Sequence, residues 1–198
     1  MEIKEKLTKL RQLMSEAELD AYIIPSFDPH HSEYVAEYFK CRQWVSGFTG
    51  SAGTVVITAE SAGLWTDGRY SIQAEQQLEN LGIQLFKMAD PGVPSYPDWL
   101  KETLRERACV GFDGNVFSVA MVQEMQKAFA AKAITLRPDR DLIGELWNDR
   151  PESPDGPLFI HDVMYAGKSR VEKLKIIRAD MREKGASHYL LTSLDDIA

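Results

Sequence analysis

Residues 10–28 read LRQLMSEAELDAYIIPSFD, a helical pattern followed by a short apolar strand and a polar turn. Residues 177–195, IRADMREKGASHYLLTSLD, repeat this stretch without a gap. The two copies match at Arg11/Arg178, Met14/Met181, Glu16/Glu183, Tyr22/Tyr189, Ser26/Ser193 and Asp28/Asp195. A strand is not stable without a sheet around it, and the second copy stops directly after its strand. We therefore expect this chain to be the front part of a longer protein.

The first copy opens an alternation of helices and strands. Apolar residues three or four apart predict a helix over residues 3–17. A short continuous apolar run predicts a buried strand over residues 21–24. Asp28 and Pro29 resemble an N-cap and a first helical residue. The helix that they would start carries Tyr34, Val35, Tyr38 and Phe39 on one face.

The central part of the sequence predicts a mixed sheet. TVVIT (54–58) and AGLWT (62–66) are separated by a tight connection, which indicates an antiparallel hairpin. Helices are expected at residues 70–81, 96–105, 118–132 and 142–147, and strands at residues 83–86, 109–112 and 134–136. This order indicates an α/β fold, a mixed β-sheet flanked by helices.

A linker divides the chain. RPESPDGP (150–157) contains three prolines and a glycine with little apolar content. A second helix is expected from Ser169, with Val171, Leu174, Ile177 and Met181 as its apolar stripe and Gly185 as its stop. We therefore predict a first domain over residues 1–150, a linker over residues 151–168, and the truncated start of a second, homologous domain over residues 169–198.

Composition excludes several classes of function. The formal net charge of −7 argues against a surface for nucleic acid or an anionic membrane. Cys41 and Cys109 lie far apart in no metal or redox spacing, so we interpret them as reduced thiols. The charged N-terminus has no secretory apolar region, and no apolar run is long enough to span a bilayer.

Two polar motifs have simple structural explanations. GFTGSAG (47–53) is glycine-rich, but the residues after it look like a strand, whereas a phosphate-binding loop opens a helix. A tight turn with close backbone approach therefore explains the glycines better than nucleotide binding. Asp28, His30, His31 and Glu33 could share a metal, but an Asp-Pro helix start explains Asp28 without one.

A third motif, WTDGRY (65–70), leaves two alternatives open. Arg69 could bind a carboxylate through two hydrogen bonds, or Asp67 and Arg69 could form a surface pair at a strand-to-helix corner. No Ser/His/Asp or Cys/His set can be assembled from the remaining residues. From its chemistry alone, the sequence shows no catalytic residues.

The ordered set of motifs nevertheless resembles a known family. DPHHSEY (28–34), Arg42, SGFTGSAG (46–53) and WTDGRY (65–70) follow one another as in the N-terminal domain of cytosolic, three-domain Xaa-Pro aminopeptidases, or aminopeptidases P, of the creatinase/prolidase superfamily. His161, Asp162 and the segment YAGKS (165–169) also resemble that family's passage into its second domain. The resemblance covers essentially the whole chain.

The resemblance implies a creatinase/prolidase N-terminal fold, which is ribonuclease H-like, and explains the repeat as two such domains in series. A catalytic "pita-bread" domain, absent from this sequence, would follow and hold two divalent metal ions, manganese in the family. No cofactor is expected in this chain itself, which we expect to be inactive alone. The implied partners are peptides with proline in the second position and a second copy in a homodimer, in the cytoplasm, with no nucleic acid and no membrane.

The resemblance also selects candidate site residues for the mouth of an active site or for a subunit interface: Asp28, His30, Glu33, Tyr34, Arg42, Asp67 and Arg69. No catalytic residue and no metal ligand can be assigned. Because the superfamily includes proteins that have lost catalysis, a peptidase-like protein-binding module is the alternative function.

Overall fold

The computed structural model describes residues 1–197 and divides the chain after Ser153 into two units. Residue 198, the last of the predicted second domain, lies outside the described residues. The first unit contains one six-stranded sheet. Its strands are β1 (Ala21–Pro25), β2 (Thr54–Thr58), β3 (Ala62–Thr66), β4 (Gln84–Lys87), β5 (Cys109–Phe112) and β6 (Thr135–Arg137).

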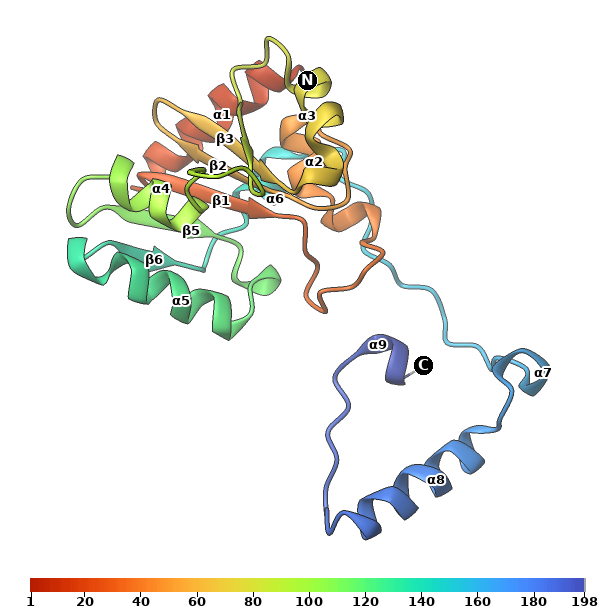
Figure 1. The fold of residues 1–198 in the computed structure, drawn as a ribbon. Helices are drawn as coiled ribbons and strands as arrows, with labels where there is room; N and C mark the ends of the chain where they lie inside the picture. Colours follow the sequence, from red (N-terminus) through yellow and green to blue (C-terminus); the bar gives the residue numbers. More distant parts are fainter. Residues whose placement is uncertain (198) are drawn as a thin grey trace. The chain divides into compact units, whose positions relative to one another are not determined.

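The strand order β4-β3-β2-β1-β5-β6 makes the sheet mixed. β2 is antiparallel to both β1 and β3, whereas β1 with β5, β5 with β6 and β3 with β4 are parallel pairs. The predicted hairpin and the predicted mixed sheet are therefore confirmed. Every strand except β2 ends at the same edge of the sheet (Figure 1).

Helices cover both faces of the sheet (Figure 1). The bounds in the first unit are α1 (Ile3–Glu16), α2 (Cys41–Ser46), α3 (Ser71–Leu78), α4 (Tyr96–Thr103), α5 (Val119–Phe129) and α6 (Leu142–Leu146). Short 3-10 turns are η1 (Glu37–Phe39), η2 (Gly68–Tyr70), η3 (Gly114–Val116) and η4 (Ala130–Lys132). One buried cluster joins α1, α2, α3 and α6 to the sheet, and the other joins α4 and α5 to its opposite face.

Alternation along the strands produces the two clusters. In β1, Tyr22 and Ile24 belong to the cluster under α1, whereas Ile23 belongs to the cluster under α4 and α5. Trp65 in β3 stacks on Phe86 in β4 with ring centroids 4.1 Å apart on the second face. Because both faces are covered, the inner strands β1, β2 and β3 are buried along almost their whole length, whereas the edge strands β4 and β6 also carry exposed polar residues.

The predicted helix at Asp28–Pro29 is wrong. His31 has a left-handed backbone with φ of 54°, which no continuing helix accommodates. Tyr34, expected to share one helix face with Val35, Tyr38 and Phe39, is 88% exposed. The segment forms a turn and then η1, and α2, which the sequence analysis missed, follows at Cys41.

The second unit contains α7 (Val163–Ala166), α8 (Arg170–Glu183) and α9 (Leu194–Ile197). Ser169 and Glu172 form a capping box at the start of α8, and Gly185 with φ of 65° follows its end, as predicted. The strand expected in the second copy, at the residues that align with 21–24 (188–191), is not formed: these residues have neither helix nor strand, and none of the described strands pairs with them. No helix within residues 1–197 is long and apolar enough to cross a membrane.

Candidate functional site

Strand directions bring three distant motifs to one edge of the sheet. β1 ends before Ser26 and Asp28, and β3 ends before Asp67. β2, which runs the opposite way, begins at this edge directly after the glycine-rich loop, because Thr54 pairs with both Pro25 and Trp65. Ligands of α/β sheets commonly bind outside such carboxyl ends of strands. This edge is therefore the expected location of a ligand-binding site.

Asp28 organises the loop after β1. It is 7% exposed, and its Oδ1 accepts hydrogen bonds from the backbone N–H of His30 (2.9 Å) and of Ser32 (3.0 Å). Burial opposes ionisation of this carboxyl, but the hydrogen bonds from Ser32 and His30 outweigh it, so its pKa lies below the ordinary value. Phe27 and His31 stack with centroids 4.4 Å apart. The loop is thus held by local contacts without a helix.

Arg42, from α2, joins two loops. Its side chain is buried, and its Nε donates to Ser26 Oγ at 2.8 Å. Nη1 donates to the Phe48 carbonyl at 2.6 Å, and Nη2 donates to the Gly50 carbonyl. Ser26 Oγ in turn donates to the Gly53 carbonyl at 2.7 Å. Burial lowers the pKa of Arg42 to about 10.

The glycine-rich loop is shaped by packing. Gly47 ends α2 with a left-handed φ of 74°. A Cβ on Gly50 would lie 2.3 Å from Phe48 Cζ and 2.8 Å from Tyr70 Cδ1. Thr49 N donates to Gln77 Oε1 of α3 at 2.9 Å, which fixes the loop on that helix. The glycines therefore allow close approach, and the loop leads into a strand as the sequence indicated.

Asp67 and Arg69 form the surface pair that was one of the two alternatives. Arg69 Nε donates to Asp67 Oδ1 at 2.9 Å, and Nη2 donates to Oδ2 at 2.8 Å. The hydrogen bond from Arg69 lowers the pKa of Asp67, and the same bond raises the pKa of Arg69. Both side chains are exposed to solvent. Their charges are therefore largely satisfied by each other.

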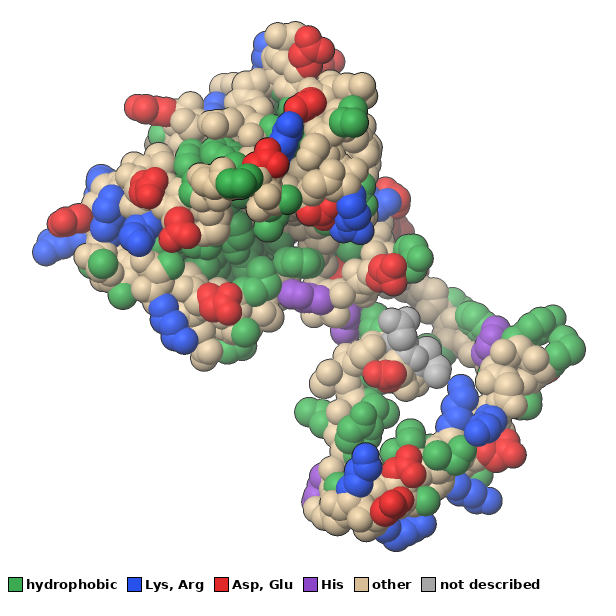
Figure 2. Space-filling view, viewed as in Figure 1, with side chains coloured by type: hydrophobic (Ala, Val, Ile, Leu, Met, Phe, Trp, Pro, Cys, Tyr) green, Lys and Arg blue, Asp and Glu red, His purple; other side chains and the backbone are tan. Residues whose placement is uncertain are grey.

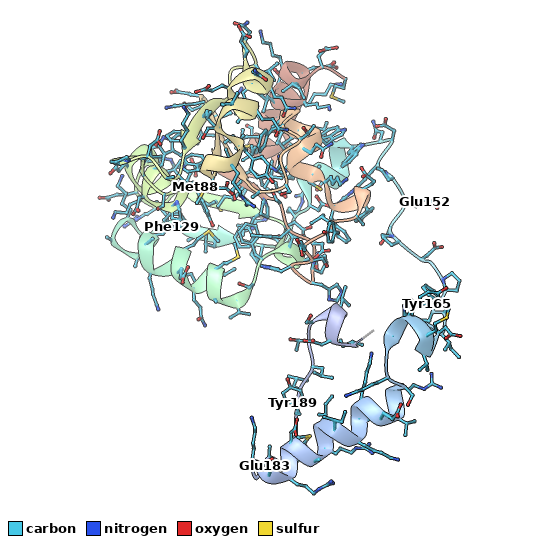
Figure 3. The ribbon with its side chains drawn as sticks, turned by 45° about the vertical axis from the view of Figure 1, so that its right-hand side comes forward. Met88, Phe129, Glu152, Tyr165, Glu183 and Tyr189 are labelled. Carbon is cyan, nitrogen blue, oxygen red and sulfur yellow. The ribbon has the colours of Figure 1, made fainter. Side chains whose placement is uncertain are left out.

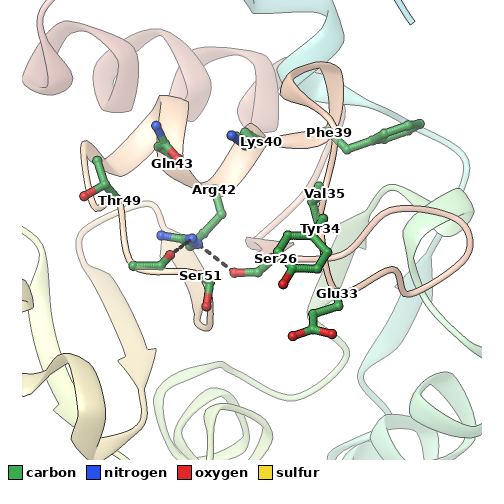
Figure 4. A pocket seen from close by; sticks show the side chains of 11 residues that line it. Ser26, Glu33, Tyr34, Val35, Phe39, Lys40, Arg42, Gln43, Thr49 and Ser51 are labelled. Carbon is green, nitrogen blue, oxygen red and sulfur yellow. Dashed lines mark hydrogen bonds between the residues drawn. The ribbon is translucent and has the colours of Figure 1, made fainter. Parts of the chain in front are cut away.

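A pocket of about 370 Å³ lies beside these loops (Figure 4). Three predicted candidates line it: Glu33, Tyr34 and Arg42. The structure does not bring Asp28, His30, Asp67 or Arg69 into its lining. The remaining lining residues, which sequence analysis did not select, are Ser26, Val35, Phe39, Lys40, Gln43, Thr49, Gly50 and Ser51.

One sequence signal could have found part of this lining. Ser26 follows one predicted strand, and Thr49 and Ser51 lie in the glycine-rich loop that precedes another. All three are hydroxyl side chains close to a predicted strand. Lys40 and Gln43 could not have been selected, because α2 itself was not predicted. Their place in the pocket depends on the turn of the chain between β1 and α2.

The described residues do not fit a metal centre. No group of three or more His, Cys, Asp or Glu side chains within residues 1–197 could hold a metal ion together. Asp28, which belonged to the metal hypothesis, instead directs its Oδ1 to two backbone N–H groups. We therefore derive no step of metal chemistry from these side chains.

Comparison with known proteins gives the context of this edge. Family models described as creatinase/prolidase N-terminal domain match residues 6–143 and, in a second model, residues 149–198. Aminopeptidase P2 of Arabidopsis thaliana is 41% identical over 99% of this chain. The chain spans only 28% of that relative's length.

Solved structures agree with this relationship. The X-prolyl aminopeptidase of Caenorhabditis elegans, a cytosolic enzyme with a di-nuclear active site, matches 100% of this chain and 34% of its own chain, with 34% identity and a TM-score of 0.86. The N-terminal domain of the cytoplasmic peptidase PepQ of Mycobacterium tuberculosis matches 72% of this chain with 24% identity and a TM-score of 0.55, which shows the fold alone. The chain therefore belongs to the creatinase/prolidase N-terminal domain family.

Proposed function

We propose that this chain is the non-catalytic N-terminal portion of a metallo-aminopeptidase that removes the N-terminal residue preceding proline. One observation carries the proposal: the C. elegans X-prolyl aminopeptidase matches the chain over its whole length with a TM-score of 0.86. Relatives named Xaa-Pro aminopeptidases or aminopeptidases P match it at 36% to 41% identity. The chain spans about a third of such proteins, so catalysis would belong to the remainder.

The proposed domain organisation follows the repeat. Residues 1–150 form a creatinase-type N-terminal domain, residues 151–168 a linker, and residues 169–198 the start of a second, homologous domain. The separate family match at residues 149–198 and the division after Ser153 support this organisation. A catalytic domain beyond these residues would complete the enzyme.

The first domain would restrict access to the active site and support subunit assembly. Its candidates for these roles are Asp28, His30, Glu33, Tyr34, Arg42, Asp67 and Arg69. Support comes from the sheet edge, where the segments after β1 and β3 that contain most of these residues lie next to one another, and from Arg42 of α2, which bonds to Ser26. Arg69 would extend an Asp67-anchored guanidinium from this edge. An Arg69→Ala substitution in the intact enzyme should then change KM or assembly, and unchanged kinetics and assembly would remove this role.

The parent enzyme would use two divalent metal ions, manganese by family resemblance, to activate water and polarise the scissile carbonyl. The ligands for these ions would belong to the remainder of the protein, and no group of three or more His, Cys, Asp or Glu side chains within residues 1–197 could hold a metal ion. We further propose peptides with proline in the second position as substrates, a homodimer, and a cytoplasmic location without nucleic-acid or membrane partners. The C. elegans neighbour is a cytosolic enzyme with a di-nuclear active site, which supports the location and the metal count.

The deciding experiment isolates the native gene product from its source cells. Its intact mass and C-terminal peptides are measured, and hydrolysis is compared on peptides that differ only in proline or alanine at the second position. We expect a product about three times the length of this chain, selective for proline, inactivated by a chelator and restored by Mn²⁺. The purified 198-residue chain should not hydrolyse either peptide.

The controls separate the proposal from its alternative. A long product without hydrolysis, after metal has been restored, would make a protein-binding module the better function. Hydrolysis by the purified chain alone would show that the assignment of catalysis to the missing part is wrong.

A further inference from the structure

Arg42 is a buried cation without an acidic partner. Its side chain is 4% exposed, yet none of the ion pairs found within residues 1–197 includes it. Its three hydrogen-bond acceptors are neutral: the Ser26 hydroxyl and the carbonyls of Phe48 and Gly50. Buried charges in proteins are normally paired, because desolvation of an unpaired ion is costly.

The guanidinium also retains unused donors. It has five N–H groups, and three of them are used in its hydrogen bonds to Ser26, Phe48 and Gly50. Two N–H groups therefore have no hydrogen-bond acceptor among residues 1–197, and the positive charge, which lies 4.8 Å from the centre of the Phe48 ring, has no acidic counter-ion there. Arg42 lines the pocket of about 370 Å³, in which its guanidinium lies between Ser26 and the loop that carries Thr49 and Ser51 (Figure 4).

The rest of the pocket suits an organic anion. Lys40 supplies a second cation to the lining, and its own acidic partner, Glu37, is exposed and outside the pocket. Phe39 and Val35 provide apolar wall, and Tyr34 provides an aromatic ring with a hydroxyl. The volume falls within the range of small-molecule sites. Glu33, the acid in the lining, is drawn across the pocket from Arg42 (Figure 4).

We propose that Arg42, with Lys40 beside it, forms a carboxylate-binding site in this pocket. The ligand would be either the C-terminal carboxylate of a peptide or the side-chain carboxylate of an acidic residue. A guanidinium fork matches a carboxylate geometrically, and burial strengthens the pairing. Carboxylate binding goes beyond the function proposed above and can be measured whether or not the parent protein is a peptidase.

The test titrates the 198-residue chain with acetate, N-acetylglycylproline and the amide of that peptide. The Arg42 Nε–H resonance is followed by NMR. We expect a saturable shift with both acids and binding about tenfold weaker with the amide, because the amide lacks the charged acceptor. The Nε–H of Arg69, which is exposed and paired with Asp67, is the internal control and should show no saturable shift.

A further ligand distinguishes the two sources of carboxylate. N-acetylglycylglutamylglycinamide presents only a side-chain carboxylate. Tighter binding of this peptide than of N-acetylglycylproline would assign the site to acidic side chains, and the reverse would assign it to peptide C-termini. Equal binding of acid and amide, or the absence of a saturable shift in the folded chain, would overturn the proposal.

Substitutions test the site independently. Gln43→Glu adds a carboxylate to the pocket lining, so it should abolish acetate binding and raise the melting temperature. Gln123→Glu on the exposed surface of α5 is the matched control and should leave binding unchanged. Arg42→Lys keeps the charge but loses the fork, and binding should be lost. If Arg42→Lys does not fold, the Gln43→Glu variant alone tests the site. Acetate binding by Gln43→Glu as tight as that of the natural chain would contradict the proposal.

Discussion

Gly50 occupies a position where no side chain fits. The rings of Phe48 and Tyr70 lie where its Cβ would be, and neither ring is the flexible end of a side chain. We therefore expect Gly50→Ala to lower the free energy of unfolding of the first unit by about 2 kcal/mol. Urea unfolding followed by tryptophan fluorescence measures this, since all four tryptophans lie in the first unit.

Gly68→Ala is the control for this prediction. The nearest atom to a Cβ at Gly68 is Ala89 Cβ at 4.0 Å, so the space is open. Its effect should stay within about 0.5 kcal/mol. Equal losses at the two glycines would show that the close aromatic contact does not limit position 50.

Asp28 should make the stability of the first unit depend on pH. Its folded-state pKa lies below the ordinary carboxyl value because hydrogen bonds to the ionised form outweigh burial. A depressed folded pKa contributes stability above the unfolded pKa, and this contribution is lost as pH falls through the folded pKa. At pH 7, Asp28→Asn should therefore be less stable than the natural chain by about 1 kcal/mol.

The unfolding free energies of the natural chain and of Asp28→Asn should converge at acidic pH. The folded-state pKa of Asp28 lies below the ordinary carboxyl value of about 4. As pH falls through that lowered pKa, the natural side chain becomes neutral like asparagine, so the difference in unfolding free energy should shrink. Urea unfolding at a series of pH values measures the gap. Glu106→Gln is the control, because Glu106 is exposed and forms no ion pair within residues 1–197. A gap that stays constant with pH would contradict the charge explanation.

At the scale of elements, Arg150 holds the end of the first unit against η1 and α6. Its Nη1 donates to Asp141 Oδ2 at 2.6 Å, and its Nε donates to the Tyr38 carbonyl at 2.8 Å. Its Cζ also lies 3.7 Å from the centre of the Tyr38 ring. Asp141 in turn caps α6 by accepting from Gly144 N. Arg150 therefore links three segments through one largely buried side chain.

We expect Arg150→Met to lower the unfolding free energy of the first unit by about 2–3 kcal/mol, because it leaves the Asp141 carboxylate without its partner. Arg140→Met is the matched control, since Arg140 pairs with Glu145 of α6 but both side chains are exposed. That change should cost less than about 1 kcal/mol. Urea unfolding of both variants gives the comparison, and equal effects would show that burial of the Arg150 pair is unimportant.

The repeat shows which elements a sequence can predict. Leu174, Ile177 and Met181 of α8 align with Leu7, Leu10 and Met14 of α1, and both helices form as predicted. Helical hydrogen bonds lie within the segment, and local caps such as Ser169 reinforce them. The strand predicted at residues 188–191 needs a partner from elsewhere in the chain, so its pattern alone was insufficient.

The site was less predictable than the fold for a related reason. Motif order selected Arg42 and Glu33, but the pocket arises from α2 and from the turn at His31, which a periodicity argument cannot foresee. Asp28 resembled a helix cap because the same oxygen can accept from either a helix or an isolated turn. Local hydrogen bonds to Asp28, and not the spacing of apolar residues, determine the conformation of the segment after β1.

At the scale of the whole molecule, the second unit differs from the first in how its apolar residues are covered. Leu158 is 102% exposed and Phe159 is 83% exposed, in a stretch without helix or strand. Within the second unit, Tyr165 and Tyr189 are also exposed (Figure 3), and apolar side chains are visible across its surface (Figure 2). In α1, by contrast, Leu7, Leu10 and Met14 are buried against the sheet.

This contrast predicts where a protease cuts first. Chymotrypsin cleaves after large apolar residues, and it needs an exposed segment that can adopt an extended conformation. We expect the first cut after Leu158 or Phe159, with residues 1–153 remaining folded because their apolar residues are packed on both faces of the sheet. Mass spectrometry of timed digests locates the cut.

The surviving fragment should keep the unfolding midpoint of the first unit, since none of the described hydrogen bonds or ion pairs of Arg150 crosses the cut. Replacing Leu158 and Phe159 with glycine removes the preferred bonds without touching the first unit. In that variant, cleavage should slow and move to residues after 160, where Tyr165 is exposed. First cleavage inside residues 1–150 in either chain would mean that the sheet unit is not independently stable, and the proposed boundary at residues 150–168 would be wrong.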